Sequence, residues 1–170
     1  MSKNERPGIE PGRSLRPGFD EWAMGVARAV SLRGDCTRRQ VGAVVLDVNH
    51  RIIGAGYNGG PVGGASCLLG QCPRGRHWAR SPVLCGCGGG WPCPQAVDPG
   101  SSYDTGPGAC VAVHAELNAV LDVSDRRRLE GATLYVTEEP CGGCRKIIAN
   151  TGIRRVVWPG GEYCQGLTYV

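Results

Sequence analysis

The stretch 132–158, ATLYVTEEPCGGCRKIIANTGIRRVVW, decides the fold class of this 170-residue chain. Its apolar ends, 132–137 and 153–158, each predict a strand, and the segment 141–150 between them predicts a helix that ends before Gly152. A strand, a helix and a second strand in this order indicate a crossover between two parallel strands. The sequence therefore predicts an α/β domain.

Further elements are predicted on both sides of this unit. A helix is expected over 19–32, with the apolar residues of one face recurring at three- or four-residue spacing: Phe19, Trp22, Val26 and Val30. The valine-rich segment 40–47, a turn and the segment 51–57 predict an antiparallel hairpin. A largely buried helix is expected over 111–123, whereas 159–170 gives no clear signal.

Two boundaries organise the chain. Residues 1–18 are polar and interrupted by prolines, which predicts a disordered N-terminal tail. Residues 19–170 are expected to form a single domain, in which 59–109 is an insertion rich in cysteine and glycine. A structureless loop of that length is uncommon in a compact domain, so local ties such as metal ligation are expected to order it.

Composition narrows the class of protein. No apolar run approaches the roughly 18 residues of a membrane span, and no secretory leader is evident, so we expect a soluble, cytoplasmic protein. The net charge of +4 is mild, and the chain has no dense basic and aromatic stripe that would favour nucleic acid. The ten cysteines favour metal ligation in a cytoplasmic chain, with an extracellular disulfide scaffold as the alternative.

Two short segments carry the residues for chemistry. His114 and Glu116 lie in one predicted helix, and Cys141 and Cys144 begin another directly after a strand. His-x-Glu followed later by Pro-Cys-x-x-Cys is the signature of zinc deaminases. Three protein ligands leave the fourth tetrahedral position of zinc for water, and Glu116 is expected to move protons between that water, a ring nitrogen and the departing ammonia.

Each part of this pattern has another interpretation when it is taken alone. A Cys-x-x-Cys pair also occurs in structural zinc sites and in redox centres. His114 by itself suits a core position, and Glu116 by itself suits a solvated helix face. The joint pattern, with each part in its expected strand and helix context, favours a catalytic zinc site.

The chain resembles the deoxycytidylate (dCMP) deaminase family of the cytidine deaminase superfamily over most of its length, from about Trp22 to Trp158. Four stretches carry the resemblance: 36–45 (CTRRQVGAVV), 56–63 (GYNGGPVG), 114–120 (HAELNAV) and 140–152 (PCGGCRKIIANTG). The resemblance implies a three-layer α/β/α fold around a mixed central sheet. It also implies a catalytic zinc ion on His114, Cys141 and Cys144, with Glu116 as the proton shuttle.

The resemblance further implies a reaction. A zinc-bound hydroxide attacks C4 of cytosine and converts dCMP to dUMP and ammonia, with dCTP and dTTP as expected effectors and a homo-oligomer, often a hexamer, as the expected assembly. Such enzymes occur in bacteria and in phages. The alternatives are a deaminase of CMP, deoxycytidine or a modified base, a deaminase acting on nucleic acid, and a non-catalytic zinc module.

A second, structural zinc ion is expected near Cys36 and Cys67, where similar proteins often keep its ligands. The residues that would complete this set are Cys72, Cys85 and Cys93, and the further donors in the insertion or beside it are His77, Cys87 and Cys110. Ordinary buried thiols are the alternative interpretation.

Substrate contacts are expected where the strand 51–57 ends, because active-site loops gather at such ends in α/β sheets. Tyr57 and Asn58 lie in a Gly-Tyr-Asn-Gly stretch that the resemblance ties to nucleotide binding, with a tight turn as the alternative. Arg39 is taken as a substrate contact among the cations available for a phosphate group, which are Arg38, Arg39, Arg74, Arg76 and Lys146. Asn118 is a candidate neighbour of the zinc site, and the run 126–128 is expected to be a solvated face.

Overall fold

The structure, a computed structural model, describes residues 16–77, 87 and 109–165. The helices are α1 (Phe19–Ser31), α2 (Pro73–Arg76), α3 (Ala115–Asp122), the 3₁₀ helix η1 (Arg126–Leu129) and α4 (Gly142–Ile148). The strands are β1 (Gly42–Leu46), β2 (Ile52–Tyr57), β3 (Thr133–Val136), β4 (Arg155–Trp158) and β5 (Gly161–Cys164). Among the described residues, no helix has the length and apolar character needed to cross a membrane.

The strands form one mixed sheet in the order β2-β1-β3-β4-β5. β1 pairs antiparallel with both β2 and β3, and β3 pairs parallel with β4 through the α4 crossover, as the sequence predicts. β5 then pairs antiparallel with β4 and adds an edge strand, in a segment whose sequence gives no clear signal. Its four residues alternate only between partly buried and exposed, which leaves little hydrophobic signal in the sequence.

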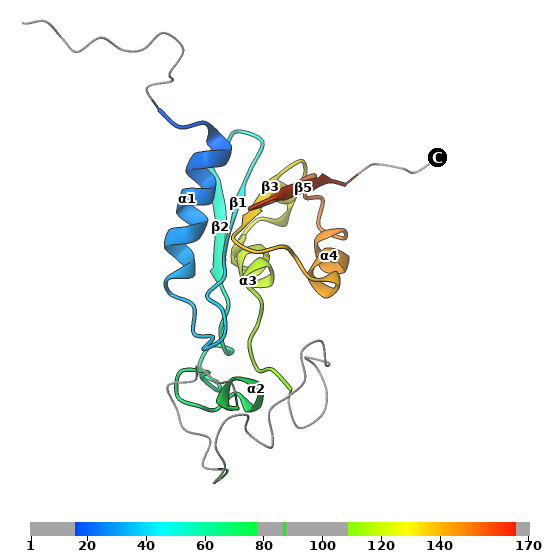
Figure 1. The fold of residues 1–170 in the computed structure, drawn as a ribbon. Helices are drawn as coiled ribbons and strands as arrows, with labels where there is room; N and C mark the ends of the chain where they lie inside the picture. Colours follow the sequence, from blue (N-terminus) through cyan, green and yellow to red (C-terminus); the bar gives the residue numbers. More distant parts are fainter. Residues whose placement is uncertain (1–15, 78–86, 88–108, 166–170) are drawn as a thin grey trace, which may run out of the picture.

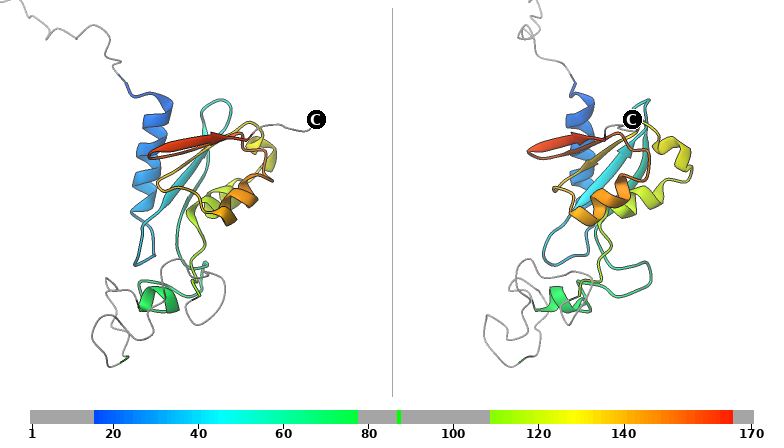
Figure 2. Two further views of the ribbon diagram at one scale, coloured as in Figure 1. Left: turned by 45° about the vertical axis from the view of Figure 1, so that its right-hand side comes forward. Right: turned by 90° about the vertical axis from the view of Figure 1, so that its right-hand side faces the viewer.

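Helices cover the sheet on both faces, which gives the expected three layers (Figures 1 and 2). α1 packs on one face, where Val44, Leu46 and Tyr135 are buried. α3 and α4 pack on the other face, where the alternate residues of the same strands, such as Val45 and Leu134, are buried. Because β1 is buried on both faces, its sequence reads as a continuous apolar run rather than an alternating one.

The structure bears out part of the predicted face of α1, because Val26 and Val30 are half-buried and pack against the core. The buried residues of the helix are Ala23, Met24 and Ala27, whereas Phe19 is 54% exposed and Trp22 is 38% exposed. Close packing is the reason, because a Cβ at Gly42 of β1 would lie 2.1 Å from the carbonyl oxygen of Ala27. Small side chains therefore occupy the contact, and the large aromatic residues lie at its edge.

α3 begins later than the sequence predicts and lies close to β2. The residues before it are extended, because Val113 exchanges backbone hydrogen bonds with Gly59, and the helix starts only at Ala115. A Cβ at Gly56 of β2 would lie 2.3 Å from the backbone nitrogen of Ala119, so glycine permits this approach. His114 is consequently the residue that caps the helix at its N-terminal end.

The described part of the 59–109 insertion lies at one end of the sheet, beyond the ends of α1 and β2 (Figures 1 and 2). It contains α2, whose N-cap is Cys72. The predicted tail residues 1–15 lie outside the described residues, as do Cys85 and Cys93 of the insertion.

Candidate active site

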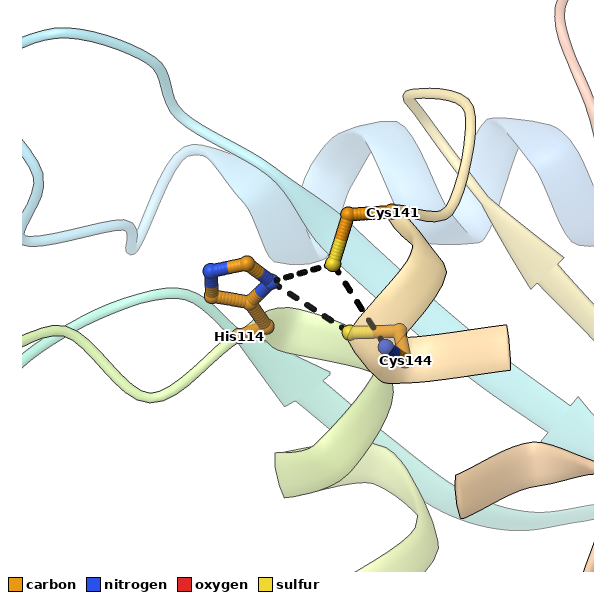
Figure 3. A group of neighbouring side chains, drawn as sticks. All are labelled: His114, Cys141 and Cys144. Carbon is orange, nitrogen blue, oxygen red and sulfur yellow. Dashed lines mark hydrogen bonds between the residues drawn. The ribbon is translucent and has the colours of Figure 1, made fainter. Parts of the chain in front are cut away.

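His114, Cys141 and Cys144 form a compact group of metal-binding donors (Figure 3). Their donor atoms all lie within 4.8 Å of one another. The Nδ1 atom of His114 is 3.6 Å from the Sγ of Cys141 and 3.3 Å from the Sγ of Cys144. Three residues that are separated in sequence by up to 30 positions are therefore brought together at the ends of two helices.

Local structure fixes both cysteines. Cys141 is the N-cap of α4, and its Sγ accepts a hydrogen bond from the backbone N–H of Cys144 at 3.4 Å. Arg145 holds the preceding residues, because its Nε donates to the carbonyl of Pro140 at 2.9 Å and its guanidinium pairs with Glu139 at 2.5 Å. The same guanidinium lies over the rings of Trp158 in β4 and Tyr163 in β5, so both strands support this loop.

The donor set fits zinc. One imidazole nitrogen and two thiols are ligands that zinc prefers, and three of them leave a fourth tetrahedral position open. Cys144 is buried and Cys141 is exposed, and all three donor residues line one cavity. Burial raises the pKa of the Cys144 thiol, and the nearby charges of Glu116 and Cys141 raise it further. A divalent cation counteracts this effect, because it replaces the proton on each thiol.

Glu116 lies in the first turn of α3 and is 4% exposed. It lines the same cavity, of about 750 Å³, as His114, Cys141 and Cys144. A carboxylate at this position is close to the donor group without being one of its three members. This arrangement suits proton transfer at a reacting centre.

The cavity also contains two of the predicted cationic residues. Arg38 and Arg39 line it together with Glu138 and Glu139, and Arg39 forms an exposed ion pair with Glu138 at 3.7 Å. The remaining cations that the sequence analysis named do not line this cavity: Arg74, Arg76 and Lys146. Arg74 is instead buried within α2, inside the insertion.

Asn58 and Tyr57 differ in their positions. Asn58 lines the cavity and is 7% exposed, but its amide oxygen accepts the N–H of Val41 at 2.9 Å and its amide nitrogen donates to the carbonyl of Arg39 at 2.8 Å. Its side chain therefore shapes the loop that presents Arg39. Tyr57 is not among the cavity residues, and its carbonyl accepts a hydrogen bond from Asn118 at 2.7 Å. Asn118 thus ties α3 to the end of β2.

A second group of thiols lies beside this cavity. Its members, which we name the four-cysteine group, are Cys36, Cys67, Cys72 and Cys110. The thiol of Cys67 contacts those of Cys36 and Cys72, and the Sγ atoms of Cys72 and Cys110 are 4.0 Å apart. The four sulfurs form a chain of contacts. Cys110 was named in the sequence analysis only as a further candidate, because its sequence separation from the others hides its proximity.

The protonation equilibria of these thiols reflect their crowding. The hydrogen bond from Cys67 lowers the pKa of Cys36 to about 6, and the hydrogen bond from Cys110 lowers the pKa of Cys72. The same contacts raise the pKa of Cys67 and Cys110. Within each contact one thiol therefore ionises more easily while its neighbour keeps its proton, and a cation among them would allow all four to ionise.

Asp35 anchors the loop that carries Cys67. Its carboxylate accepts the hydroxyl of Ser66 at 2.7 Å and the backbone N–H of Cys67 at 2.8 Å. Further backbone N–H groups of Gly60 and Leu68 complete the contacts at 3.4 and 3.3 Å. The four-cysteine group also borders the cavity directly, because Cys36 and Cys110 are among its lining residues.

Comparison with known proteins places this geometry in a family. The family described as "Cytidine and deoxycytidylate deaminase zinc-binding region" matches residues 17–159. The chain belongs to the cytidine and deoxycytidylate deaminase family. This membership confirms the resemblance drawn from the sequence, and the matched region contains every member of the His114, Cys141 and Cys144 group.

Individual members of this deaminase family are similar to this chain in sequence. The deoxycytidylate deaminase of Mycobacterium phage D29 is 47% identical over 144 residues, which cover 85% of this chain and 96% of that protein. The deoxycytidylate deaminase of Schizosaccharomyces pombe is 34% identical over 150 residues, covering 88% of this chain but 39% of that longer protein.

A solved structure supports the fold. The dCMP deaminase of cyanophage S-TIM5, in complex with dCMP and dUMP, superposes with a TM-score of 0.55 at 26% identity. The superposition covers 85% of this chain and 83% of that chain. The three-layer arrangement around a mixed sheet is therefore a cytidine-deaminase-like fold.

Proposed function

We propose that this protein is a zinc-dependent deaminase that converts dCMP and water to dUMP and ammonia. The observation that carries the proposal is the His114, Cys141 and Cys144 group, which shares one cavity with the buried Glu116. The similarity to the phage D29 deoxycytidylate deaminase along almost the whole length of that protein supports dCMP as the substrate. Residues 19–170 would act as a single catalytic domain, which the tail precedes.

Different side chains of this protein would bind the metal and transfer protons. His114, Cys141 and Cys144 would hold zinc, which lowers the pKa of water to about 7 and so supplies a nucleophile at neutral pH. Glu116 would take a proton from the attacking water and deliver it to N3 of cytosine. It would then take the remaining proton from the new C4 hydroxyl and pass it to the amine, which departs as ammonia while the C4 carbonyl forms. The burial of Glu116 excludes bulk water from these transfers.

Arg38 and Arg39 would receive the 5′-phosphate of the nucleotide. They are the arginines that line the cavity among the described residues, and guanidinium groups bind phosphate oxygens in a bidentate manner. The ion pair between Arg39 and Glu138 is exposed and long, so a phosphate dianion can compete for the guanidinium at low cost. Asn58 would act indirectly, by fixing the backbone of Arg39.

The four-cysteine group would hold a second zinc ion with a structural role. Four thiolates are a common ligand set for structural zinc. The ion would join the loop after α1, the start of the insertion and the segment before α3. From Cys110 the chain continues to Val113, which pairs with Gly59, and then to His114. The second ion would therefore stabilise the approach of His114 to the catalytic group.

Zinc content tests this second site. We expect Cys110→Ser to lose one zinc ion per chain and to lower the thermal stability, whereas Cys164→Ser, which alters an exposed cysteine of β5, keeps the full zinc content. Equal zinc contents in the two variants would contradict the proposed structural site.

A panel of cytosine compounds tests the substrate. Purified zinc-loaded protein is assayed for ammonia release with dCMP, CMP, dCTP, deoxycytidine and cytosine. We expect the highest kcat/KM with dCMP, and a larger rise in KM than fall in kcat for Arg39→Gln. Preference for CMP or deoxycytidine would replace dCMP by the corresponding alternative substrate. Absence of turnover with every compound would contradict the proposed activity.

The remaining expectations concern the assembly and its setting. We propose that the enzyme acts in the cytoplasm as a homo-oligomer, and that dCTP and dTTP act as its effectors. Light scattering after size-exclusion chromatography measures the assembly, and dCMP saturation curves with added dCTP or dTTP measure the regulation. A monomer with hyperbolic curves unaffected by either triphosphate would contradict this proposal.

A further inference from the structure

A glutamate shares the exposed part of the catalytic cavity with the two arginines. Glu138 and Arg39 line this cavity with side chains that are 52% and 69% exposed, whereas Glu116 in the same cavity is 4% exposed. The cavity therefore has a buried end, where Glu116 lies, and an exposed end that carries charges of both signs. The proposed reaction uses the arginines at this exposed end but gives Glu138 no role.

Neighbouring strands hold the backbone of both charged residues. Glu138 comes two residues after the end of β3, and the intervening Thr137 exchanges hydrogen bonds with Gly42 at the start of β1. Arg39 precedes β1, and its carbonyl accepts the side-chain amide of Asn58 at 2.8 Å. Because β1 and β3 are antiparallel neighbours, the start of one lies beside the end of the other. The guanidinium of Arg39 is consequently 3.7 Å from the carboxylate of Glu138, and an anion that binds Arg39 must lie close to Glu138.

We propose that Glu138 is a specificity-determining residue that disfavours nucleoside di- and triphosphates relative to monophosphates. This inference rests on the proposed function, in which Arg38 and Arg39 receive the 5′-phosphate. A monophosphate can take the place of the Glu138 carboxylate at Arg39, because one anion then replaces another. Each further phosphate group, attached to the 5′-phosphate at this exposed end, adds negative charge beside the displaced carboxylate. Like charges brought together in this way disfavour the complex with the longer ligand.

The adjacent glutamate does not have this role. Glu139 also lines the cavity, but its carboxylate pairs with Arg145 at 2.5 Å, within the loop that carries Cys141. Arg145 does not line the cavity, whereas the partner of Glu138 is the arginine that would bind the phosphate. Binding of a nucleotide therefore uncovers the charge of Glu138 and leaves that of Glu139 balanced.

The expected effect is modest, because the side chains of Arg39 and Glu138 are both exposed. One extra negative charge about 5 Å from a carboxylate lowers the affinity about fourfold at the dielectric constant of water. Salt weakens such an interaction, since the Debye length is about 10 Å at 0.1 M ionic strength. Removal of the Glu138 charge is therefore expected to change the preference between a mono- and a diphosphate by about threefold at low salt.

Binding of two uracil nucleotides tests the proposal without the need for turnover. Titration calorimetry at low salt gives the Kd values of dUMP and dUDP for zinc-loaded wild type, Glu138→Gln and Glu138→Asp. We expect wild type to bind dUMP more tightly than dUDP, and Glu138→Gln to shift the ratio of the two Kd values about threefold in favour of dUDP. Glu138→Asp keeps the charge and should keep the wild-type ratio. Glu21→Gln is the matched control, since Glu21 lies on α1 outside the cavity.

The ratio of the two Kd values decides the outcome. An unchanged ratio in Glu138→Gln would overturn the proposal, as would tighter binding of dUDP than of dUMP by wild type, or binding of neither nucleotide. An equal shift in Glu138→Asp would show that the charge is not responsible and would overturn it as well.

Turnover of dCMP and dCDP by the same proteins separates this proposal from the proposed function. The ratio of the two kcat/KM values should shift in Glu138→Gln in the same direction as the Kd ratio. Turnover of dCMP with no effect of Glu138→Gln on either ratio would contradict the selectivity alone. Selective binding that depends on Glu138, without turnover of any cytosine compound, would contradict the deaminase activity alone.

Discussion

A buried carboxylate connects the β1–β2 hairpin to η1, and its removal offers a quantitative test. Asp47 follows β1, and its Oδ1 atom accepts the backbone N–H groups of Asn49 and Arg51, each at 3.0 Å. Its Oδ2 atom accepts the guanidinium of Arg128 at 2.6 Å. The side chain of Asp47 is 8% exposed and that of Arg128 is 42% exposed. The run 126–128 is exposed, as predicted, and Arg128 has a structural role in addition.

The free energy of unfolding that is lost in Arg128→Ala is expected to lie between two limits. A hydrogen bond to a charged group contributes about 1.5–3 kcal/mol, whereas an exposed ion pair contributes about 0.2–1 kcal/mol. The carboxylate is covered by its own turn and by Arg128 rather than by deep protein, so solvent screening reduces the interaction. We expect a loss of about 1–2 kcal/mol in the free energy of unfolding, which lowers Tm by about 2–8 °C.

Urea unfolding in saturating zinc measures this loss, with an unchanged m-value as the criterion that the unfolded state is unaffected. The matched control is Arg127→Ala. Arg127 pairs with Asp125 at 3.0 Å but is 91% exposed, and we expect no measurable change in its unfolding midpoint. Equal effects of the two substitutions would refute the argument that burial of the acceptor determines the energy.

The same pair predicts a pH dependence. The hydrogen bond from Arg128 holds the pKa of Asp47 below its ordinary value. A carboxyl whose pKa is lowered on folding stabilises the protein above its unfolded pKa of about 3.9, and the contribution is lost as the pH falls through the folded value. The stability difference between wild type and Arg128→Ala should therefore be constant near neutral pH and shrink below about pH 4. A difference that grows on acidification would contradict this assignment.

Three further substitutions test the packing and the zinc loop. Gly56→Ala places a Cβ 2.3 Å from the nitrogen of Ala119, and we expect a loss of at least about 2 kcal/mol in urea unfolding. Gly25→Ala meets nothing within 4 Å on the exposed face of α1 and should stabilise the protein by about 0.5–1 kcal/mol. Arg145→Gln removes the bond to Pro140 and should raise the rate at which a chelator extracts one zinc ion, measured by a zinc dye. Unaltered extraction would rule out a positioning role for this arginine.

The elements that sequence predicts well are those with local signals. The strand-helix-strand order around Cys141 appears in the structure as β3, α4 and β4, because apolar runs and a helix stop at Gly152 mark them directly. The spacing of His114 and Glu116, together with that of Cys141 and Cys144, likewise identified the compact donor group. These patterns depend on neighbours within a few residues.

The features that sequence missed depend on distant contacts. α3 starts at Ala115 rather than at 111, because Val113 pairs with Gly59, over 50 positions away. Arg128 is exposed, as expected, but nothing nearby in sequence indicates its bond to Asp47. Asn58 lines the cavity, where it was expected to contact the nucleotide, but the sequence did not reveal that its amide also binds the backbone at Arg39 and Val41. From sequence alone, a polar residue that hydrogen-bonds within the protein cannot be distinguished from one that binds a ligand.

Glu116 is proposed to move protons at a zinc site formed by His114, Cys141 and Cys144. The most direct measurement is dCMP turnover by Glu116→Gln, with zinc content determined on the same sample and Glu21→Gln, an exposed glutamate of α1, as the control. We predict a fall in kcat of about 10²–10⁴-fold with unchanged zinc content in Glu116→Gln, and full activity in Glu21→Gln. Wild-type turnover by a zinc-loaded Glu116→Gln protein would contradict the account.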